Sequence, residues 1–348
     1  MKRLPRILMV APTCGTYGGI ETFTAEIARE VIGSGEFDVQ VVFRIRPGFQ
    51  VTDNLHLGLS RHEFPWRLMD KPDFRYLKDL VRADVINCHF PLLYATYPAV
   101  LLRKKLAITV ENQRWPEHGQ LYQKALMLGD ARWYISTFVA STWEGKQFAP
   151  GSHIVPAVSE LPDEWREPST RKGFFFIARW IPKKGIEELI EAYAAADIDH
   201  QLHPLTLLGD GPLRQEIEVM IRQSAVGRFI DAPGFMSHPE KIERMANARW
   251  NVAPAAFAED LGLSPIEARA CGVPSIVSNV GGLPEAAGEN ALLCEPGDVA
   301  TLQAALEKAA SMSESEYFQR SKDAKESLVF YLPKPGFYTE EFRKLLTR

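Results

Sequence analysis

Residues Glu259–Glu285, EDLGLSPIEARACGVPSIVSNVGGLPE, hold the pattern from which the fold is predicted. Within them, Ser264-Pro265-Ile266-Glu267 predicts a helix start, with Ser264 at the N-cap and Glu267 where a capping-box carboxylate belongs. The helix follows Gly262 directly, so its free backbone N–H groups form a ready anion site. The tetrapeptide alone favours a plain cap over a ligand contact for Glu267, because capping boxes are common.

On both sides of this stretch, short apolar runs that predict strands alternate with helical patterns. In the second half of the chain the predicted strands are Gly173–Ala178, Pro204–Leu208, Asn251–Ala253 and Pro274–Ser278. In the first half they are Arg6–Ala11, Asp38–Phe43, Asp84–Cys88, Leu106–Val110 and Arg132–Ile135. This alternation favours parallel sheets that are covered by helices on both faces.

A length of 348 residues favours two domains. We predict two tandem Rossmann-like domains whose parallel sheets face a central cleft, in residues 1–158 and 173–334. The polar stretch 159–172 contains two prolines and is interpreted as a linker. A short amphipathic helix within 335–348 is expected to cross back onto the first domain. Ligands in such sheets bind at the carboxyl ends of the strands.

Composition and charge point to an ordinary globular protein with an uneven charge distribution. Apolar residues make up 46% of the chain and charged residues 24%. The net charge of −4 combines a basic first half with an acidic second half. The basic half suggests contact with an anionic partner such as a membrane surface, with Arg103, Lys104 and Lys105 as candidates, and chance is the alternative. No nucleic-acid partner is expected.

Neither cysteines nor apolar runs indicate a secreted or membrane-spanning chain. The four cysteines lie far apart and form no C-x-x-C pair, which gives no sign of a zinc site or a disulfide framework. The apolar run after the basic start is too short for a signal peptide. The uncharged stretch Val85–Leu102 contains two prolines and fits a strand, a loop and a helix better than a membrane span. We therefore expect a cytoplasmic protein, peripheral at most on the inner face of the membrane.

Glu259 and Glu267 form an E-x(7)-E pair, followed by Ala270-Cys271-Gly272-Val273-Pro274 and Gly281-Gly282-Leu283-Pro284-Glu285. This long segment closely resembles the donor-site signature of glycosyltransferase family four. Further stretches resemble the family in the expected order: Tyr17–Glu21, Ala178–Gly185, Leu208–Pro212 and Pro233–Phe235. The resemblance implies a retaining, metal-independent enzyme with the two-domain GT-B fold. It implies a nucleoside diphosphate sugar as donor, with uridine expected ahead of guanosine.

The resemblance also implies roles for single residues. Arg179 and Lys184 would grip the diphosphate, Glu267 would bind the ribose hydroxyls, and Glu259 would face the transferred hexose. The remaining donor-binding residues would be Gly18, Gly19, Gly209, Gly211, Phe235, Gly262 and Leu263. Cations at these places have a chemical reason, because negative charge develops on the phosphate oxygens as the nucleotide leaves.

The acceptor would be a hydroxyl of a glycan, a lipid-linked intermediate or a small molecule, in bacterial polysaccharide or glycoconjugate synthesis. We expect neither a cofactor nor a metal ion. Asp197-Ile198-Asp199 has the spacing of a metal-binding pair, but its position after an Ala-rich helix favours a solvated helix end. Two alternatives stay open: an epimerase or phosphorylase on the same fold, and a non-catalytic nucleotide-binding module.

The chain departs from the family after the predicted strand Leu106–Val110, where Glu111 stands in place of the usual His. Glu111 would act on a sugar hydroxyl or pair with Arg114 as a structural ion pair. His118 lies in the next loop and is the alternative source of the missing imidazole. His89 follows another predicted strand and is expected to line the cleft, although a lone His in an apolar strand is more often structural.

Overall fold

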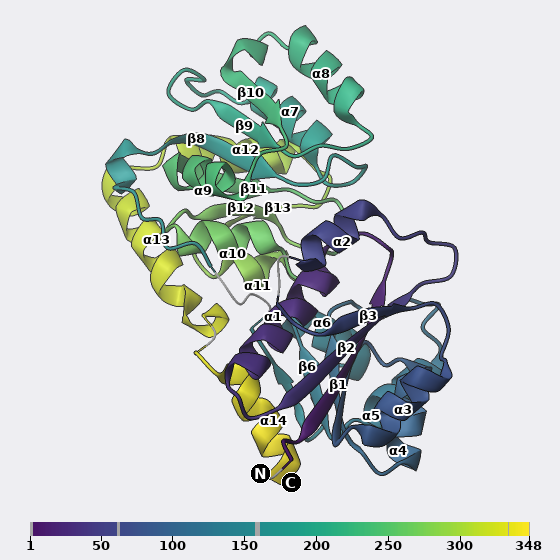
Figure 1. Cartoon of the computed structure of the whole chain (residues 1–348). Coiled ribbons are helices and arrows are strands. Elements are labelled where there is room, and N and C mark those ends of the chain that lie inside the picture. The colour runs from purple at the N-terminus through teal and green to yellow at the C-terminus, as the bar shows by residue number, and fades with distance from the viewer. Residues whose placement is uncertain (1–2, 61–62, 157–160, 333, 348) are drawn as a thin grey trace. The chain divides into compact units, whose positions relative to one another are not determined.

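A computed structural model of the chain describes residues 3–60, 63–156, 161–332 and 334–347. The chain forms two compact units (Figure 1): Met1–Ser159 together with Leu332–Arg348, and Glu160–Tyr331. The boundary expected near residue 158 and the first two residues of the predicted linker 159–172 lie outside the described residues. The rest of that stretch belongs to the second unit.

The first unit is built on a seven-stranded sheet in the order β3-β2-β1-β4-β5-β6-β7. All its neighbouring strands run parallel. The strands are β1 (Arg6–Thr13), β2 (Asp38–Ile45), β3 (Trp66–Met69), β4 (Val85–His89), β5 (Lys105–Val110), β6 (Ala131–Tyr134) and β7 (Ser152–Ile154). The chain runs from β1 towards β3 on one side and from β4 towards β7 on the other. The strand order therefore reverses between β1 and β4.

Helices connect these strands: α1 (Gly19–Gly33), α2 (Asp53–Ser60), α3 (Phe74–Arg82), α4 (Leu93–Leu101), α5 (Gln120–Met127) and α6 (Thr137–Glu144). Two of them start at a side-chain cap. Asp73 accepts a hydrogen bond from the Tyr76 backbone N–H at the start of α3, and Ser136 accepts one from Val139 at α6. Such caps satisfy backbone N–H groups that the helix leaves without partners.

The C-terminal helix α14 (Phe337–Thr347) packs on this same unit. The Phe342 ring meets the Trp133 ring edge-on at 5.1 Å between centroids. The Tyr338 hydroxyl donates to the Pro156 carbonyl, and the Thr339 N–H donates to Glu30 Oε1 at 3.0 Å. Aromatic packing and buried hydrogen bonds therefore attach the end of the chain to the first unit.

The second unit is built on a six-stranded parallel sheet in the order β10-β9-β8-β11-β12-β13. The strands are β8 (Lys172–Ile177), β9 (Leu205–Leu208), β10 (Ile230–Gly234), β11 (Ala248–Ala253), β12 (Ser275–Ser278) and β13 (Leu292–Cys294). The α-helices are α7 (Ile186–Ala195), α8 (Arg214–Gln223), α9 (His238–Asn247), α10 (Leu263–Ala270), α11 (Leu283–Ala287), α12 (Val299–Ala310) and α13 (Glu314–Glu326). Single 3-10 turns lie at Pro168–Thr170, Gly227–Phe229 and Ser327–Tyr331.

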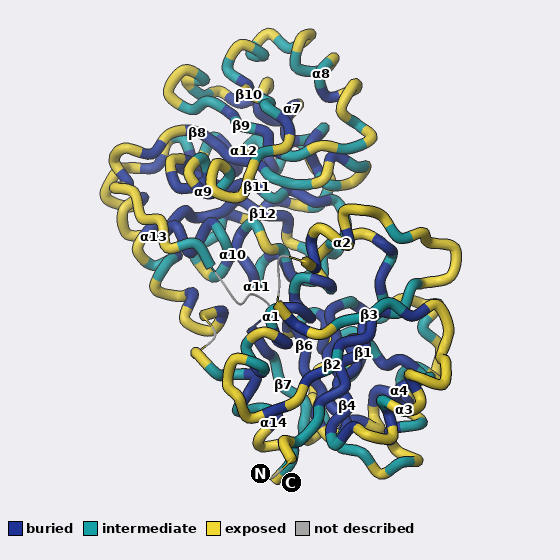
Figure 2. The backbone as a smooth tube through the Cα atoms, viewed as in Figure 1, coloured by how far each residue is buried: buried dark blue, intermediate teal, exposed yellow. Residues whose placement is uncertain are grey.

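Successive residues of β8 pack on opposite faces of the second sheet, as the strand period of two requires. Phe174 and Phe176 join the core under α7 and α12, whereas Phe175 joins the core with Met245 of α9. The central strands are accordingly buried in both units (Figure 2). Arg171, just before β8, is also buried and donates to the carbonyls of Gly272 and Cys271.

The uncharged stretch Val85–Leu102 folds as predicted into a strand, a loop and a helix, namely β4 and α4. Among the described residues, no helix is both long and apolar enough to cross a membrane.

Candidate functional site

The predicted donor-site residues follow the carboxyl ends of the strands in the second unit. Arg179 and Lys184 come after β8, and Glu259 and Gly262 come after β11. Strands β8 and β11 are neighbours in the sheet. The strand after β8 lies on one side of this pair, and the strand after β11 lies on the other side. They therefore flank the topological switch point, where ligands bind in open parallel sheets.

An ion pair joins the two sides of this switch point. Lys184 Nζ lies 2.7 Å from Glu259 Oε1, and both side chains are mostly buried. The ammonium also lies 5.0 Å from the centre of the Phe257 ring. The Ala256 N–H donates to the Lys183 carbonyl at 2.8 Å, which fixes the two loops to each other.

A cavity of about 230 Å³ opens beside this ion pair. It is lined by both charged residues, by the start of α10 at Leu263 and Ser264, and by apolar strand residues. Gly262 has a φ of 106°, and a Cβ there would lie 2.7 Å from Leu283 Cδ2. The positive φ favours glycine, and a Cβ at this position would require the Leu283 side chain to shift. The first N–H groups of α10 are therefore presented beside a lysine, an arrangement that suits an anion.

The turn after β12 holds the Glu259 loop in place. The Gly282 N–H donates to the Glu259 carbonyl at 2.7 Å. Gly281 has a φ of 65°, and a Cβ there would lie 2.5 Å from the same carbonyl oxygen. The glycine pair of the sequence pattern thus supports the loop backbone.

The capping-box interpretation of Ser264 and Glu267 is wrong. Helix α10 begins at Leu263, its N-cap is Gly262, and no side chain caps it. The helix starts earlier than predicted because the backbone already turns at Gly262. The Glu267 carboxylate instead pairs with Lys241 of α9, with Nζ and Oε1 2.7 Å apart. Sequence reasoning missed Lys241, because nothing in the sequence signals a contact between α9 and α10.

The other predicted donor residues lie on neighbouring loops. Arg179 is exposed, and its side chain forms no ion pair within the described part of the chain. Gly209 and Gly211 follow β9 and pack so closely on the Ala178–Trp180 backbone that a Cβ would clash at either position. Phe235 follows β10 and is 83% exposed.

In the first unit, polar side chains gather at the carboxyl ends of β4 and β5. His89 Nδ1 lies 2.6 Å from Glu111 Oε1, with both residues at most 9% exposed. A carboxylate accepts hydrogen bonds, so this contact fits a His89 tautomer with the proton on Nδ1. The other ring nitrogen, Nε2, is buried and has no hydrogen-bond partner among the described residues. The partner of Glu111 is therefore His89 and not Arg114, which corrects the expected structural pair.

Glu21 in the first turn of α1 adds a second buried carboxyl group to this cluster. Burial raises the pKa of Glu21, and the nearby Glu111 charge raises it further. Gly18 is the N-cap of α1, and a Cβ on Gly19 would meet no atom within 4 Å. The N-terminus of α1 is thus sterically open at the predicted glycines.

His118 belongs to an aromatic cluster. Its ring stacks on Trp143 with an interplanar angle of 16°, and Nδ1 accepts a hydrogen bond from the Trp115 N–H. Arg114 Nε donates to the His118 carbonyl. Burial lowers the pKa of His118. The structure therefore gives the imidazole of His118 a packing role and links Glu111 to His89.

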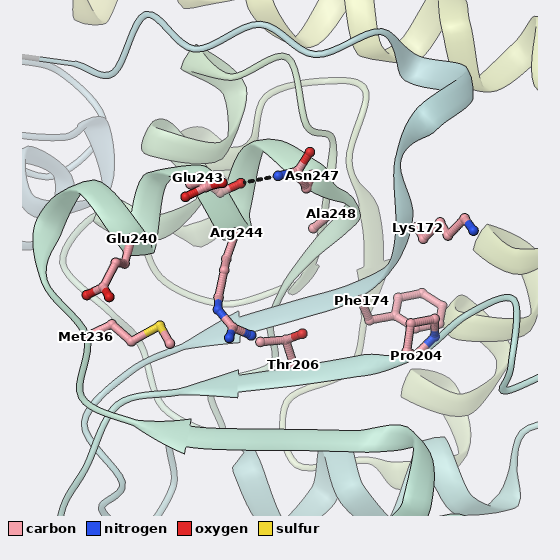
Figure 3. A pocket seen from close by; sticks show the side chains of 10 residues that line it. All are labelled: Lys172, Phe174, Pro204, Thr206, Met236, Glu240, Glu243, Arg244, Asn247 and Ala248. Atoms are coloured by element: carbon pink, nitrogen blue, oxygen red, sulfur yellow. Dashed lines mark hydrogen bonds between the residues drawn. The ribbon is translucent and has the colours of Figure 1, made fainter.

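A larger cavity of about 450 Å³ lies at the opposite end of the second sheet, between α9 and the amino ends of β8 and β9 (Figure 3). Arg244 extends from α9 towards Thr206, and its guanidinium pairs with Asp231. No residue of the predicted donor site lines this cavity.

Asp199, the second carboxylate of the expected metal-site decoy, closes a turn. Its Oδ1 accepts hydrogen bonds from the N–H groups of Gln201 and Leu202, at 2.9 and 3.3 Å. Across the described ranges, no group of three or more His, Cys, Asp or Glu side chains is arranged to hold a metal ion.

Residues 158–326 match the sequence model of the family described as glycosyl transferases group 1. Glycogen synthase of Mycobacterium tuberculosis is 32% identical over 168 residues, which cover 46% of this chain and 40% of that protein. O-antigen chain mannosyltransferase B of Escherichia coli is 33% identical over 135 residues, which cover 37% of this chain and 34% of that protein. The chain thus matches well under half the length of these curated relatives.

Similarity to solved structures extends along nearly the whole chain. The Anabaena protein HepE in complex with UDP has a TM-score of 0.81 at 16% identity, covering 98% of this chain and 99% of that one. The fold is therefore GT-B, with two Rossmann-like domains.

Proposed function

We propose that the chain is a metal-independent glycosyltransferase. It moves a hexose-type sugar from a nucleoside diphosphate to a hydroxyl, with retention at the anomeric carbon. The acceptor is a glycan, a lipid-linked intermediate or a small molecule in bacterial polysaccharide or glycoconjugate synthesis. One observation carries this proposal: Lys184, Glu259 and the start of α10 surround one cavity at the switch point of the second sheet. The family match at 158–326 covers all of these residues.

The roles in the second unit follow from charge and hydrogen-bonding capacity. Lys184 and the exposed guanidinium of Arg179 stabilise the diphosphate as it leaves, which makes a metal ion unnecessary. The N–H groups around Leu263 hold phosphate oxygens. Glu267 accepts two hydrogen bonds from the ribose diol, and Lys241 holds this carboxylate in place.

In this proposal Glu259 faces the transferred sugar, and its ion pair with Lys184 holds it at the cavity before the donor enters. When the donor enters, its diphosphate competes for the ammonium, and the carboxylate turns to the sugar hydroxyls. The departing phosphate oxygen takes the proton of the acceptor hydroxyl, so the new bond forms on the face from which the nucleotide leaves.

In the first unit, Glu111 binds a hydroxyl of the acceptor or of the donor sugar. The hydrogen bond from His89 leaves the second carboxylate oxygen of Glu111 available as an acceptor. Gly18 and Gly19 let a phosphate approach the open N-terminus of α1. The enzyme works from the cytoplasm and touches the inner face of the cell membrane.

We propose uridine diphosphate as the carrier ahead of guanosine diphosphate. Of the similar structures, HepE was solved with UDP and with UDP-glucose. A thermal-shift series with UDP, GDP and ADP tests this choice, because a bound ligand stabilises the folded state by RT ln(1 + [L]/Kd). UDP should raise the melting temperature most, and Glu267→Ala should abolish the shift. A melting temperature that none of the nucleotides changes would contradict the proposal.

A further inference from the structure

Helices α3, α4 and α5 carry an unusual number of exposed apolar side chains. On α3, Tyr76 and Leu80 face the core, whereas Phe74, Leu77 and Val81 are exposed, Phe74 by 82%. On the neighbouring α4, Leu101 is 83% exposed. These exposed α3 residues recur at helical spacing, so they form a stripe along one side of the helix.

The three helices lie together in the first unit (Figure 1). Tyr76 of α3 donates to the Tyr94 carbonyl of α4, and α4 packs directly on α5. Lys104, after α4, donates to the Val81 carbonyl at the end of α3. Leu121 of α5 adds a further exposed apolar side chain. We call the outer side of these three helices the α3–α5 face.

The charges on the α3–α5 face have predominantly one sign. Arg75, Lys78 and Arg82 on α3 and Lys124 on α5 are exposed, and none of them forms an ion pair within the described residues. The one acidic residue within these helices, Asp79, is already bound to Arg67 at 3.0 Å. The free charge is therefore positive.

We propose that the α3–α5 face docks on an anionic lipid bilayer. Exposed Leu, Phe and Val side chains would enter the boundary of the acyl chains while the Lys and Arg side chains meet the headgroup charge. A second copy of the chain is a poor occupant, because a two-fold interface would set the basic side chains against themselves. This inference rests on the proposed function only for the purpose of the membrane contact, because binding to a bilayer does not require a sugar donor.

We assign membrane binding to the α3–α5 face and not to the net charge of the first half of the chain. Lys105, one of the three cations expected from the sequence, lies at the start of β5. Lys104 donates to the Val81 carbonyl, and Arg103 is exposed. The sequence cluster therefore adds one exposed cation, Arg103, to those of α3, where cations and apolar side chains alternate.

Co-sedimentation of the full chain with lipid vesicles tests the proposal. The vesicles are phosphatidylcholine alone and phosphatidylcholine mixed with phosphatidylglycerol. Lys78→Gln with Arg82→Gln should weaken binding to the anionic vesicles by about tenfold or more at low salt. Leu77→Ser with Leu101→Ser should weaken it by about tenfold or more at low and high salt, since buried apolar area is not screened.

Matched controls carry the same changes on the second unit, at exposed positions of α8, α13, the loop before β9 and the 3-10 turn Ser327–Tyr331. They are Arg222→Gln with Lys322→Gln, and Leu202→Ser with Val329→Ser. Both control variants should bind like the unchanged protein. Thermal unfolding and UDP titration of every variant check that the fold and the donor site persist.

The outcomes separate the explanations. Failure of the unchanged protein to bind anionic vesicles, or equal binding by the α3–α5 variants and their controls, overturns the inference. So does a dimer in analytical ultracentrifugation that Leu77→Ser with Leu101→Ser dissociates, because the face would then serve a second copy. If UDP binding and transfer fail while vesicle binding persists, the proposed function falls and this surface stands.

Discussion

Lys184 connects the two loops of the switch point, and at the scale of single residues most of the proposed catalysis depends on it. Its ammonium meets Glu259 in a partly buried ion pair, and Arg179 stands exposed on the preceding turn. In the proposed reaction, negative charge grows on the leaving diphosphate. Both cations therefore stabilise the transition state more than the ground state.

Lys184→Ala and Arg179→Ala should each lower kcat by on the order of 10²-fold or more. Steady-state kinetics at saturating donor measure this. The matched control is Lys183→Ala, which removes an exposed cation from the same turn and should leave kcat nearly unchanged. A variant of Lys184 or Arg179 that altered only the acceptor KM would disprove the phosphate role.

Glu267→Ala should weaken nucleoside diphosphate binding by about 10²-fold or more, since two charge-assisted hydrogen bonds of ~1.5–3 kcal/mol each are lost. Lys241→Ala breaks the same ion pair but keeps the carboxylate, so it should cost much less affinity. Calorimetric titration of both purified variants makes the comparison. Equal losses, or a lower melting temperature with unchanged affinity, would assign Glu267 to structure alone.

Glu111→Gln should lower kcat/KM on the order of 10²-fold and keep donor affinity, because an amide accepts less well than a carboxylate. His118→Ala should keep more activity, since the structure gives His118 a place in an aromatic cluster. Kinetics under saturating donor compare the two. Near-normal turnover in the Gln variant with collapse in the Ala variant would transfer the role to His118.

Only part of the arrangement of these site residues can be predicted from the sequence. The motif pattern predicts which side chains follow which strands, because loop position is local information. It does not predict that Lys184 pairs with Glu259, Lys241 with Glu267, or His89 with Glu111. These pairs join residues 22 to 75 positions apart, and their partners depend on how neighbouring elements pack.

At the scale of elements, the sequence predicts every interior strand of both sheets. The strands it misses are β3, β7, β10 and β13, and these are the four edge strands. Interior strands are buried on both faces and appear as apolar runs. An edge strand such as β7, Ser152–Ile154, is short and only half-buried, so its composition resembles that of a loop.

The S-x-x-E pattern has different outcomes at α9 and at α10. At α9, Ser237 and Glu240 form a true capping box. At α10, the N-cap is Gly262, two residues before Ser264, so Glu267 lies too far along the helix to cap it. A local pattern predicts that a helix starts nearby, but the backbone of the preceding loop decides the first residue.

The attachment of α14 should depend on pH through Glu341. Hydrogen bonding to His153 and then Lys344, against the effect of burial, lowers the pKa of Glu341 to about 2. A carboxyl pKa that is lower in the folded state stabilises the fold above the ordinary value near 4.5, and this contribution is lost as pH falls towards 2.

Glu341→Gln should therefore cost on the order of 1–2 kcal/mol of stability at neutral pH, after allowance for solvent screening, and much less near pH 3. Thermal unfolding at both pH values checks this. Glu340→Gln on the same turn, in an exposed pair with Arg343, should change little. An equal loss for Glu341→Gln at both pH values would rule out the ionised carboxylate as the cause.

At the scale of the whole molecule, the two units differ in the features that point to function. The second unit holds the family match, the switch-point cavity and the Lys184–Glu259 pair. The first unit holds the His89–Glu111 pair and the α3–α5 face, which the sequence resemblance left open. A donor site in one unit and an acceptor and membrane contact in the other is the division of labour that we propose.

Product analysis with a labelled UDP-sugar, a mixture of lipid and glycan acceptors and excess EDTA tests the central claim most directly. The account predicts release of UDP in step with a new glycosidic bond of the donor's anomeric configuration. The Lys184→Ala variant should be nearly inactive, and the Lys183→Ala variant should be active. An epimerised UDP-sugar without UDP release, a sugar 1-phosphate as product, or activity that EDTA abolishes would contradict it.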